Sequence, residues 1–399
     1  LLHYVWKYKL YVTTSLETTD GRPVQVIDPG IQNTDAGPDF FNAKIKIDGT
    51  LWAGSVEIHD KSSNWRLHHH EANKAYDSVI LHITGVDDFQ PVRTNGEPIP
   101  QMILSVPENI IRSIDWLLYR DVPLPCLAHI AGIDPLHIAC WMEALLSERL
   151  ERKTHDIFLL LDTYQADWNE VFYITLTRNF GFGVNNDAFE RLAKSLPLRC
   201  IQKQRSSHSQ IEAMIFGQAG MLVEENDDHY YRLLQREYDF LRHKFALSPM
   251  EDFVFKNLRT RPVNFPYLKV AQLAALWVQH DTLFSAILEA RSTGDIKKYF
   301  RIPPSDYWET HYHFRYASPQ KEKTIGENAL NILLINTVVP MFFAYGLYNK
   351  RPEYCERATR LLESIPPEKN SIVSTFCNAG IAVHHAGDSQ ALIQLKREY

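Results

Sequence analysis

Glu57 and His59 stand two residues apart in a segment with the pattern of a strand. Because successive side chains of a strand point to opposite faces, these two share one face, while Val56 and Ile58 share the other. Asp39 stands at the start of the preceding strand-like segment. Carboxylate oxygens suit Mg²⁺ or Mn²⁺, and an imidazole favours Mn²⁺ or Zn²⁺. Such a cation could polarise a phosphoryl oxygen and acidify water, so Asp39, Glu57 and His59 are candidate catalytic residues, and the two carboxylates are candidate metal ligands.

Histidines are concentrated next to this segment, because five of the 17 lie between positions 59 and 82. His68 and His70 share a face if their stretch is extended, and they diverge if a helix has already begun. With His59 or Glu57 they could form a Zn²⁺ site of nitrogen and oxygen ligands, so they are further candidate metal ligands. The alternative is that these histidines are solvated, cap a helix or pair with nearby carboxylates. His82 lies inside an apolar run, where a hydrogen-bonded, half-buried histidine is expected.

Three residues nearby could contact a substrate. Trp65 could stack on a base and Arg66 could bind a phosphate, although a tryptophan that covers the sheet edge is the plainer interpretation. Lys44 projects from the polar face of a strand, where it could lie near Glu57 or remain solvated. We therefore treat Lys44, Trp65 and Arg66 as candidate substrate-binding residues.

The segments that position these residues form the pattern of a small sheet. Helical spacing occupies residues 1–10, and a short helix is expected over 69–76. Strand patterns occupy residues 24–28, 40–47, 51–59 and 78–84. The order along the chain is therefore a helix, three strands, a helix and a strand.

A strong hairpin signal, Asp48-Gly49, separates two of these strands. A two-residue turn there would pair Ile45 with Trp52 and Phe41 with Val56, which gives a continuous apolar face. Strict alternation in that register places Asp39 on the face opposite Glu57. A bend or bulge at residues 37–39 is then needed to bring the two carboxylates together.

From residue 134 onward the pattern is helical. Asp134 is expected to cap a helix that has Pro135 at its first position, and further apolar stripes follow toward the C-terminus. The stretch 121–126 has the composition of a linker. We therefore expect an α+β chain with a mixed-sheet domain over 1–125 and a larger all-helical domain over 126–399.

The composition of the 399 residues is that of a globular protein, with 45% hydrophobic and 23% charged residues. The net charge is −6, and residues 1–127 hold 11 Lys and Arg against 16 Asp and Glu, which weighs against tight binding to a polyanion. Five cysteines without a closely spaced pair favour a reducing cytoplasm. The apolar stretch 329–348 contains two amides and a proline, so we expect a buried helix and no membrane partner.

The arrangement around Glu57 resembles the PD-(D/E)XK nuclease superfamily. In that superfamily an aspartate begins the second strand, and an acidic-X-Lys triplet lies on the third strand. Here Pro38-Asp39 and Glu57-Ile58-His59 stand in these places, with histidine instead of lysine, over a similar order of elements in about residues 1–90. The resemblance implies a restriction-endonuclease-like domain and a metal-dependent phosphodiesterase, with Asp39 and Glu57 as metal ligands.

The chain is also similar to a family of uncharacterised bacterial proteins, a conserved domain of unknown function. The similarity rests on AGPDFFNAKIKIDGTLWAGSVEIHDKSSNWRLHHH and the later SVILHITG, and on RPVNFPYLKVAQLA and INTVVPMFFAYG in the helical part. It implies one family over nearly the whole chain, and it carries no assigned activity.

One expected function and two alternatives follow. The leading expectation is metal-dependent phosphodiester hydrolysis on nucleic acid, with Mg²⁺ or Mn²⁺ at Asp39 and Glu57, and with His59 orienting or deprotonating the attacking water. The first alternative is an inactive relative that binds a protein partner through its helical domain, in which Glu57 would pair with a lysine or arginine. The second is a zinc-dependent hydrolase, in which His68 and His70 converge on the same point.

Overall fold

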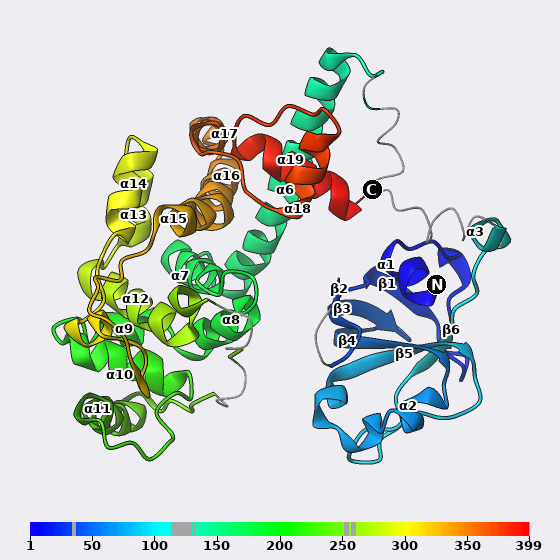
Figure 1. Ribbon diagram of the computed structural model, residues 1–399, viewed down its shortest axis with the longest axis horizontal. Coiled ribbons are helices and arrows are strands. Elements are labelled where there is room, and N and C mark those ends of the chain that lie inside the picture. The colour runs from blue at the N-terminus through cyan, green and yellow to red at the C-terminus, as the bar shows by residue number, and fades with distance from the viewer. Residues whose placement is uncertain (34–36, 113–129, 131, 251–254, 257–260, 399) are drawn as a thin grey trace. The chain divides into compact units, whose positions relative to one another are not determined.

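A computed structural model describes residues 1–33, 37–112, 130, 132–250, 255–256 and 261–398. The chain has an α+β fold and divides into two compact units, Leu1–Pro125 and Cys126–Glu398. A mixed sheet dominates the first unit and helices dominate the second, which confirms the predicted fold class (Figure 1). The predicted linker at 121–126 lies outside the described residues.

The sheet of the N-terminal unit contains antiparallel and parallel pairs. Its strands lie in the order β1-β3-β4-β5-β6, and β2 pairs with β3. Their bounds are β1 (Val24–Asp28), β2 (Ile31–Gln32), β3 (Phe40–Ile47), β4 (Thr50–Lys61), β5 (Val79–Val86) and β6 (Gln101–Ile103). Strands β1, β3 and β4 are antiparallel neighbours, whereas β5 runs parallel to β4 and β6 parallel to β5. A parallel pair needs a crossover, and the crossover from β4 to β5 carries Trp65, Arg66, His68 and His70.

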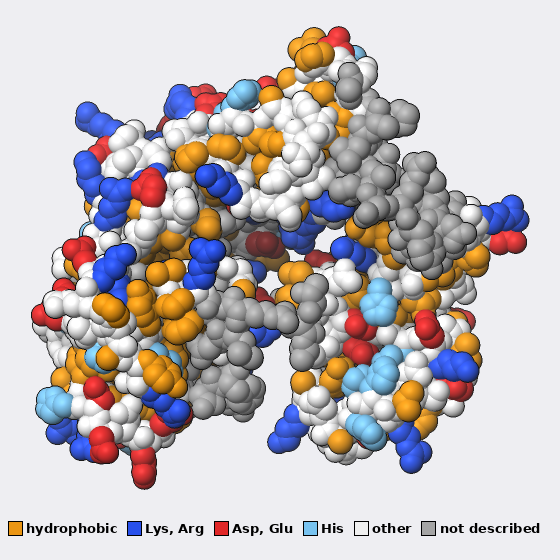
Figure 2. Space-filling view, viewed as in Figure 1, with side chains coloured by type: hydrophobic (Ala, Val, Ile, Leu, Met, Phe, Trp, Pro, Cys, Tyr) orange, Lys and Arg blue, Asp and Glu red, His pale blue; other side chains and the backbone are white. Residues whose placement is uncertain are grey.

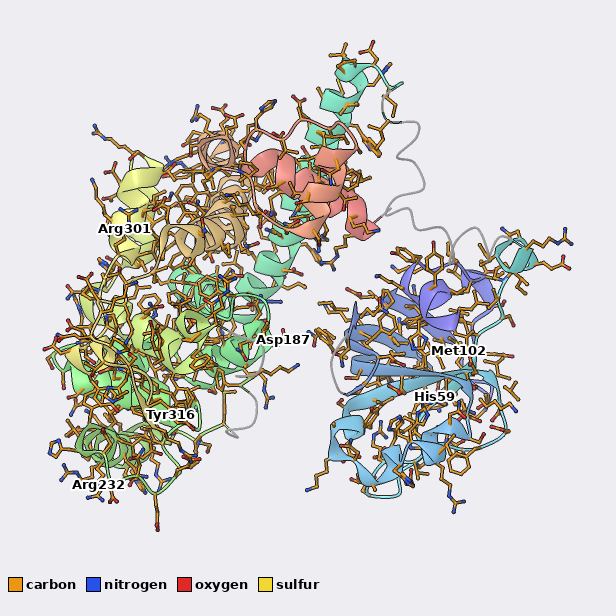
Figure 3. The ribbon with its side chains drawn as sticks, in the orientation of Figure 1. His59, Met102, Asp187, Arg232, Arg301 and Tyr316 are labelled. Carbon is orange, nitrogen blue, oxygen red and sulfur yellow. The ribbon has the colours of Figure 1, made fainter. Side chains whose placement is uncertain are left out.

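The two faces of the sheet are covered by different segments. The short helices of this unit are α1 (Leu2–Lys7), η1 (Thr13–Ser15), α2 (Asn64–Leu67), η2 (His70–Ala72), η3 (Lys74–Ser78) and α3 (Glu108–Arg112). Helix α1 packs its apolar side chains on a face that includes Met102 of β6. Trp65 of α2 and Tyr76 of η3 pack on the other side. Figure 3 shows Met102 on the α1 side of the sheet and His59 on the α2 side.

The hairpin between β3 and β4 begins as the sequence predicts. Asp48 and Gly49 form its turn with φ angles of 46° and 80°, in the left-handed region that such turns require. Ile45 pairs with Trp52, as predicted.

The far end of this hairpin differs from the prediction, because Phe40 and not Phe41 pairs with Val56. The register shifts between Phe40 and Ala43, and Asn42 within this interval has a φ of 57°. An extra residue of this kind forms a β-bulge. The side chains before it then point to the opposite faces of the sheet from those that strict alternation predicts. Phe40 therefore enters the core, and Asp39 reaches the face of β4 that carries its glutamate. The bulge lies at Asn42 and not at 37–39.

Where the structure describes it, the C-terminal unit is helical apart from one short hairpin, β7 (His311–His313) and β8 (Tyr316–Ala317). Its described α-helices are α6 (Pro135–Thr163), α7 (Trp168–Asn179), α8 (Asn186–Ser195), α9 (Leu198–Gln202), α10 (His208–Gln218), α11 (His229–Phe245), α12 (Pro266–Gln279), α13 (Leu283–Glu289), α14 (Thr293–Phe300), α15 (Glu327–Leu333), α16 (Val339–Tyr348), α17 (Pro352–Ser364), α18 (Ser371–Asn378) and α19 (Ala386–Glu398). Shorter turns are η5 (Pro262–Asn264), η6 (Asp306–Glu309) and the π-helical η7 (Leu334–Val338). The side chain of Asp134 caps α6 by accepting from the Leu136 N–H, as predicted.

The apolar segment Glu327–Tyr348 is long and apolar enough to cross a membrane, and 72% of its most apolar window is buried within the protein. Pro340 has no N–H to donate to the Asn336 carbonyl one turn before it, and Asn179 Nδ2 of α7 donates to that oxygen instead, at 3.0 Å. The amide of Asn336 accepts in turn from Lys153 Nζ of α6, at 2.9 Å. These polar contacts with neighbouring helices favour the prediction of a core helix.

Candidate metal centre

Strand β4 places Glu57 and His59 on one face, as the alternation predicts. Both are buried, with exposed fractions of 5% and 7%. The neighbouring strands continue this polar row, because Glu57 pairs with His82 of β5 and His82 pairs with Gln101 of β6. This face of the sheet therefore carries a line of polar side chains under the α2 crossover.

The crossover adds His68 and His70 through an unusual backbone conformation. Helix α2 ends at Leu67, and η2 begins at His70, so the helix predicted over 69–76 is replaced by two short 3₁₀ turns. Between them His69 adopts the left-handed conformation, with a φ of 58°. The stretch is thus neither extended nor one continuous helix, and His68 and His70 nevertheless approach the same point. A left-handed residue costs about 1–2 kcal/mol, and strain of this kind concentrates at functional sites.

One carboxylate oxygen and three imidazole nitrogens converge at this point. Glu57 Oε1 lies 3.4 Å from His59 Nε2 and 3.3 Å from His70 Nε2. His59 Nε2 lies 3.2 Å from His68 Nδ1, and one ring nitrogen of each histidine lies within 4.8 Å of the others. Ligands about 2.0–2.1 Å from a tetrahedral Zn²⁺ are roughly 3.3–3.4 Å apart. The three imidazole nitrogens therefore lie close enough to share one cation, with Glu57 Oε1 beside two of them.

The cluster is buried on its sheet side and open where His68 lies. His59 and His70 are buried, whereas His68 is exposed. Figure 2 shows histidine and acidic side chains gathered on one exposed face of the N-terminal unit. A ligand bound by the cluster would therefore be reachable from solvent.

Burial controls the protonation of these groups. It raises the pKa of the Glu57 carboxyl, against the opposing effect of His70. Burial, helped by the neighbouring histidines, lowers the pKa of His59 to about 3, and burial lowers the pKa of His82 to about 4. His70 Nε2 is buried without a hydrogen-bond partner. At neutral pH His59 and His82 are therefore neutral imidazoles, the form of histidine that binds metals.

Asp39 lies beside Glu57 and contacts different partners. Its backbone N–H donates to Glu57 Oε2 at 3.0 Å, while its Oδ2 accepts from the Ile58 N–H at 2.9 Å. The same oxygen lies 3.0 Å from Nε2 of His3 in α1. Although burial acts to raise it, the pKa of Asp39 is lowered by the hydrogen bond to His3, and that bond raises the pKa of His3. Asp39 therefore supports the cluster from behind Glu57, rather than contributing an atom to the four that converge.

The three predicted substrate-binding residues take different positions. Trp65 is fully buried, donates from Nε1 to the Val92 carbonyl, and packs edge-on against the rings of His70 and His82. It forms a wall behind the histidines. Arg66 and Lys44 are exposed, and no hydrogen bond or ion pair links either to the cluster within the described residues.

Three contributors were missed by the sequence reasoning: His3, Gln101 and Asp87. Gln101 Oε1 lies 2.9 Å from His82 Nδ1, and Gln101 Nε2 donates to Asp87 Oδ1 at 2.6 Å. Each of these residues is distant in the sequence from the group it contacts, so no local sequence pattern indicates its role. His82 is hydrogen-bonded, as predicted, but it is fully buried rather than half-buried.

Comparisons with known proteins assign the family of the chain and leave its activity open. A search of the curated proteins and a search of the solved structures each gave no match. The resemblance to the PD-(D/E)XK nucleases therefore stays a prediction. The sequence model of DUF2851, a family of proteins of unknown function, matches residues 1–371, which include the whole cluster and most of the helical unit. The chain belongs to the DUF2851 family, as its resemblance to a conserved domain of unknown function predicts.

Proposed function

We propose that the N-terminal unit is a metal-dependent hydrolase whose cation is held by Glu57, His59, His68 and His70. The observation that carries this proposal is the convergence of three imidazole nitrogens within 4.8 Å of one another, with Glu57 Oε1 at 3.3–3.4 Å from those of His59 and His70. No lysine or arginine forms an ion pair with Glu57 in the described part of the chain, as the scaffold alternative would require.

The donor set favours Zn²⁺, and Mn²⁺ after it, over Mg²⁺. Three nitrogens and one oxygen match zinc and manganese preferences, whereas Mg²⁺ prefers oxygen ligands and retained waters. When bound, such a cation supplies Lewis-acid chemistry toward a phosphoryl or carbonyl oxygen. Phosphodiesters are the proposed substrate class, because Asp39 and Glu57 share one face in the pattern that resembles the nuclease superfamily.

The side chains of this unit have separable roles in the proposed reaction. The Asp39 N–H holds Glu57 Oε2, which leaves Oε1 directed at the imidazoles. Trp65 excludes water from the back of His70. His3 is half-exposed, and its hydrogen bond to Asp39 raises its pKa, which favours the protonated form that a negatively charged substrate would contact.

The test is a metal-binding measurement followed by a cleavage panel on the full chain. Metal content is measured after dialysis against Zn²⁺, Mn²⁺ or Mg²⁺, and cleavage is measured on DNA, RNA, a small aryl phosphodiester and an aryl carboxylic ester, with EDTA as the blank. We expect one tightly bound Zn²⁺ or Mn²⁺ and metal-dependent phosphodiester cleavage.

The matched variants are Glu57→Gln and Asp60→Asn, because Asp60 is an exposed carboxylate on the same strand. Glu57→Gln should abolish cleavage and weaken metal binding, and Asp60→Asn should leave both unchanged. Cleavage of the carboxylic ester alone would retain the hydrolase and reject the phosphodiester. Failure of the folded wild-type protein to bind any of the three metals would reject the proposed function.

A further inference from the structure

A second row of side chains runs from the surface to the back of the cluster. Exposed Asp87 accepts from Gln101 Nε2 at 2.6 Å, and Gln101 Oε1 lies 2.9 Å from His82 Nδ1. His82 Nε2 lies 2.9 Å from His59 Nδ1. Gln101 and His82 are 2% and 0% exposed, so the middle of this row has no access to water.

The chemistry of the end residue fixes the direction of every hydrogen bond in the row. A carboxylate can only accept hydrogen bonds, so the side chain of Gln101 must direct its amide nitrogen at Asp87 and its amide oxygen at His82. That oxygen only accepts, so His82 carries its proton on Nδ1. A second proton on His82 would bury a cation that contacts only an amide oxygen and another imidazole, which is costly. His82 Nε2 is therefore an acceptor, and His59 Nδ1 must donate to it.

We propose that Gln101, held by Asp87, is a positioning residue that sets the tautomers of His82 and His59, so that His59 presents an unprotonated Nε2 to Glu57, His68 and His70. Metal-binding histidines generally donate their other ring N–H to an outer partner, which fixes the ring and its tautomer. Here the partner is another histidine, and its own tautomer is set one residue further out. The expected effect of Gln101 on metal binding rests on the proposed metal centre. The tautomers of His82 and His59 do not, because they are a property of the metal-free protein.

The direct test is the tautomer of each ring in the metal-free full chain at neutral pH. Histidine labelled with ¹⁵N gives two-bond proton–nitrogen correlations that distinguish the two ring nitrogens, and the His59→Asn and His82→Asn variants assign the peaks. We expect neutral rings protonated on Nδ1 at both positions. A proton on Nε2 of His59, or a doubly protonated His82, would overturn the inference.

The second test measures Zn²⁺ affinity by competition with a chromophoric chelator. Gln101→Met removes the acceptor for His82 and should weaken Zn²⁺ binding about 10–100-fold, the usual effect of losing an outer-shell partner. Gln101→Glu restores an acceptor and should recover most of the affinity, and Gln25→Met on the exposed face of β1 is the control.

The outcomes separate this inference from the proposed function. If the wild-type protein binds Zn²⁺ and Gln101→Met binds it with equal affinity, the role of Gln101 is rejected and the metal centre stands. Absence of Zn²⁺ binding in the folded wild type would reject the metal centre, and with it the role of the row in metal binding. If Gln101→Met does not fold, the wild-type tautomers and the Gln101→Glu affinity decide the question.

Discussion

Each unit buries a glutamate, and the two glutamates have different kinds of partners. In the C-terminal unit Glu212 of α10 is 1% exposed, and its oxygens accept from Tyr230 OH, from Ser305 Oγ at 3.1 Å and from Trp308 Nε1 at 2.8 Å. In the N-terminal unit Glu57 Oε2 accepts from the Asp39 N–H, while Oε1 faces two imidazole nitrogens. Burial raises the pKa of both carboxyls.

The difference lies in the chemical groups that surround each buried charge. Lys323 repeats the pattern of Glu212, because its buried Nζ donates to three carbonyl oxygens and to Ser318 Oγ at 2.7–3.0 Å. Such groups fix loops and leave nothing for a ligand. Around Glu57 the partners of Oε1 are imidazole nitrogens. Hydroxyl and indole groups can only hydrogen-bond Glu212, whereas imidazoles beside a carboxylate can also bind a metal.

The largest expected effect comes from the three consecutive histidines, of which His68 and His70 each place a ring nitrogen in the cluster. His68→Asn and His70→Asn each remove a ligand and should weaken Zn²⁺ binding by more than the ~100-fold typical of outer-shell changes. His69→Asn keeps a residue type that tolerates the left-handed backbone and should bind normally. Competition with a chelator measures all three, and an equal loss in His69→Asn would remove the contrast between the ligands and their neighbour.

Acid should destabilise the N-terminal unit before the C-terminal unit in the metal-free protein. His59 and His82 have pKa values of about 3 and about 4 in the folded state, below that of an unfolded histidine. The unfolded chain therefore binds more protons as the pH falls below about 6.5, and each group costs roughly 2 kcal/mol of stability between pH 7 and pH 5. The raised pKa of Glu57 acts in the opposite direction and offsets part of this loss.

In the C-terminal unit burial raises the pKa of Glu212 as it raises that of Glu57, and His208, whose Nε2 lies 3.8 Å from Glu212 Oε2, is only half-buried. Hydrogen exchange followed by mass spectrometry at both pH values reports each unit separately. We expect protection of β4 and β5 to fall at the lower pH while that of α10 persists. Simultaneous loss of protection in both units would contradict the comparison.

Replacing each glutamate by glutamine should change stability in opposite ways. Glu212→Gln places an amide NH₂ among groups that already donate, and should destabilise the C-terminal unit by roughly 2–3 kcal/mol. Glu57→Gln removes a buried charge and keeps an amide oxygen for the Asp39 N–H, and should leave the metal-free N-terminal unit equally stable or more stable by up to ~1 kcal/mol. Denaturant unfolding of metal-free protein gives both values, and a large destabilisation by Glu57→Gln would mean that its contacts are structural.

The smallest expected effect concerns two left-handed residues. His69 and Ala246, which ends α11, have φ angles of 58° and 51°. Replacing either by glycine should give a net stabilisation of about 0.5–1 kcal/mol, because the relief of backbone strain exceeds the additional entropy that glycine loses on folding. We expect a similar rise in the midpoint of thermal unfolding for both variants, with metal affinity altered by His69→Gly alone through a looser approach of His68 and His70. An unchanged affinity in His69→Gly would show that the neighbouring packing suffices to hold these rings.

The sequence by itself determined the local parts of this protein. Two-residue periodicity placed Glu57 and His59 on one face, Asp48-Gly49 formed the turn, and Asp134 and Pro135 began α6. These features depend on backbone preferences of a few consecutive residues. The family was also visible in the sequence, from short strings spread over most of the chain.

Only the tertiary structure decided the composition of the site. The bulge at Asn42 carries Asp39 to Glu57, and the left-handed turn at His69 lets His68 and His70 meet. His3 and Gln101 arrive from an N-terminal helix and the last strand of the sheet. Each of these features depends on strand register or on long-range packing, because a single inserted residue reverses a face and a residue's cross-strand neighbours are far away in the sequence.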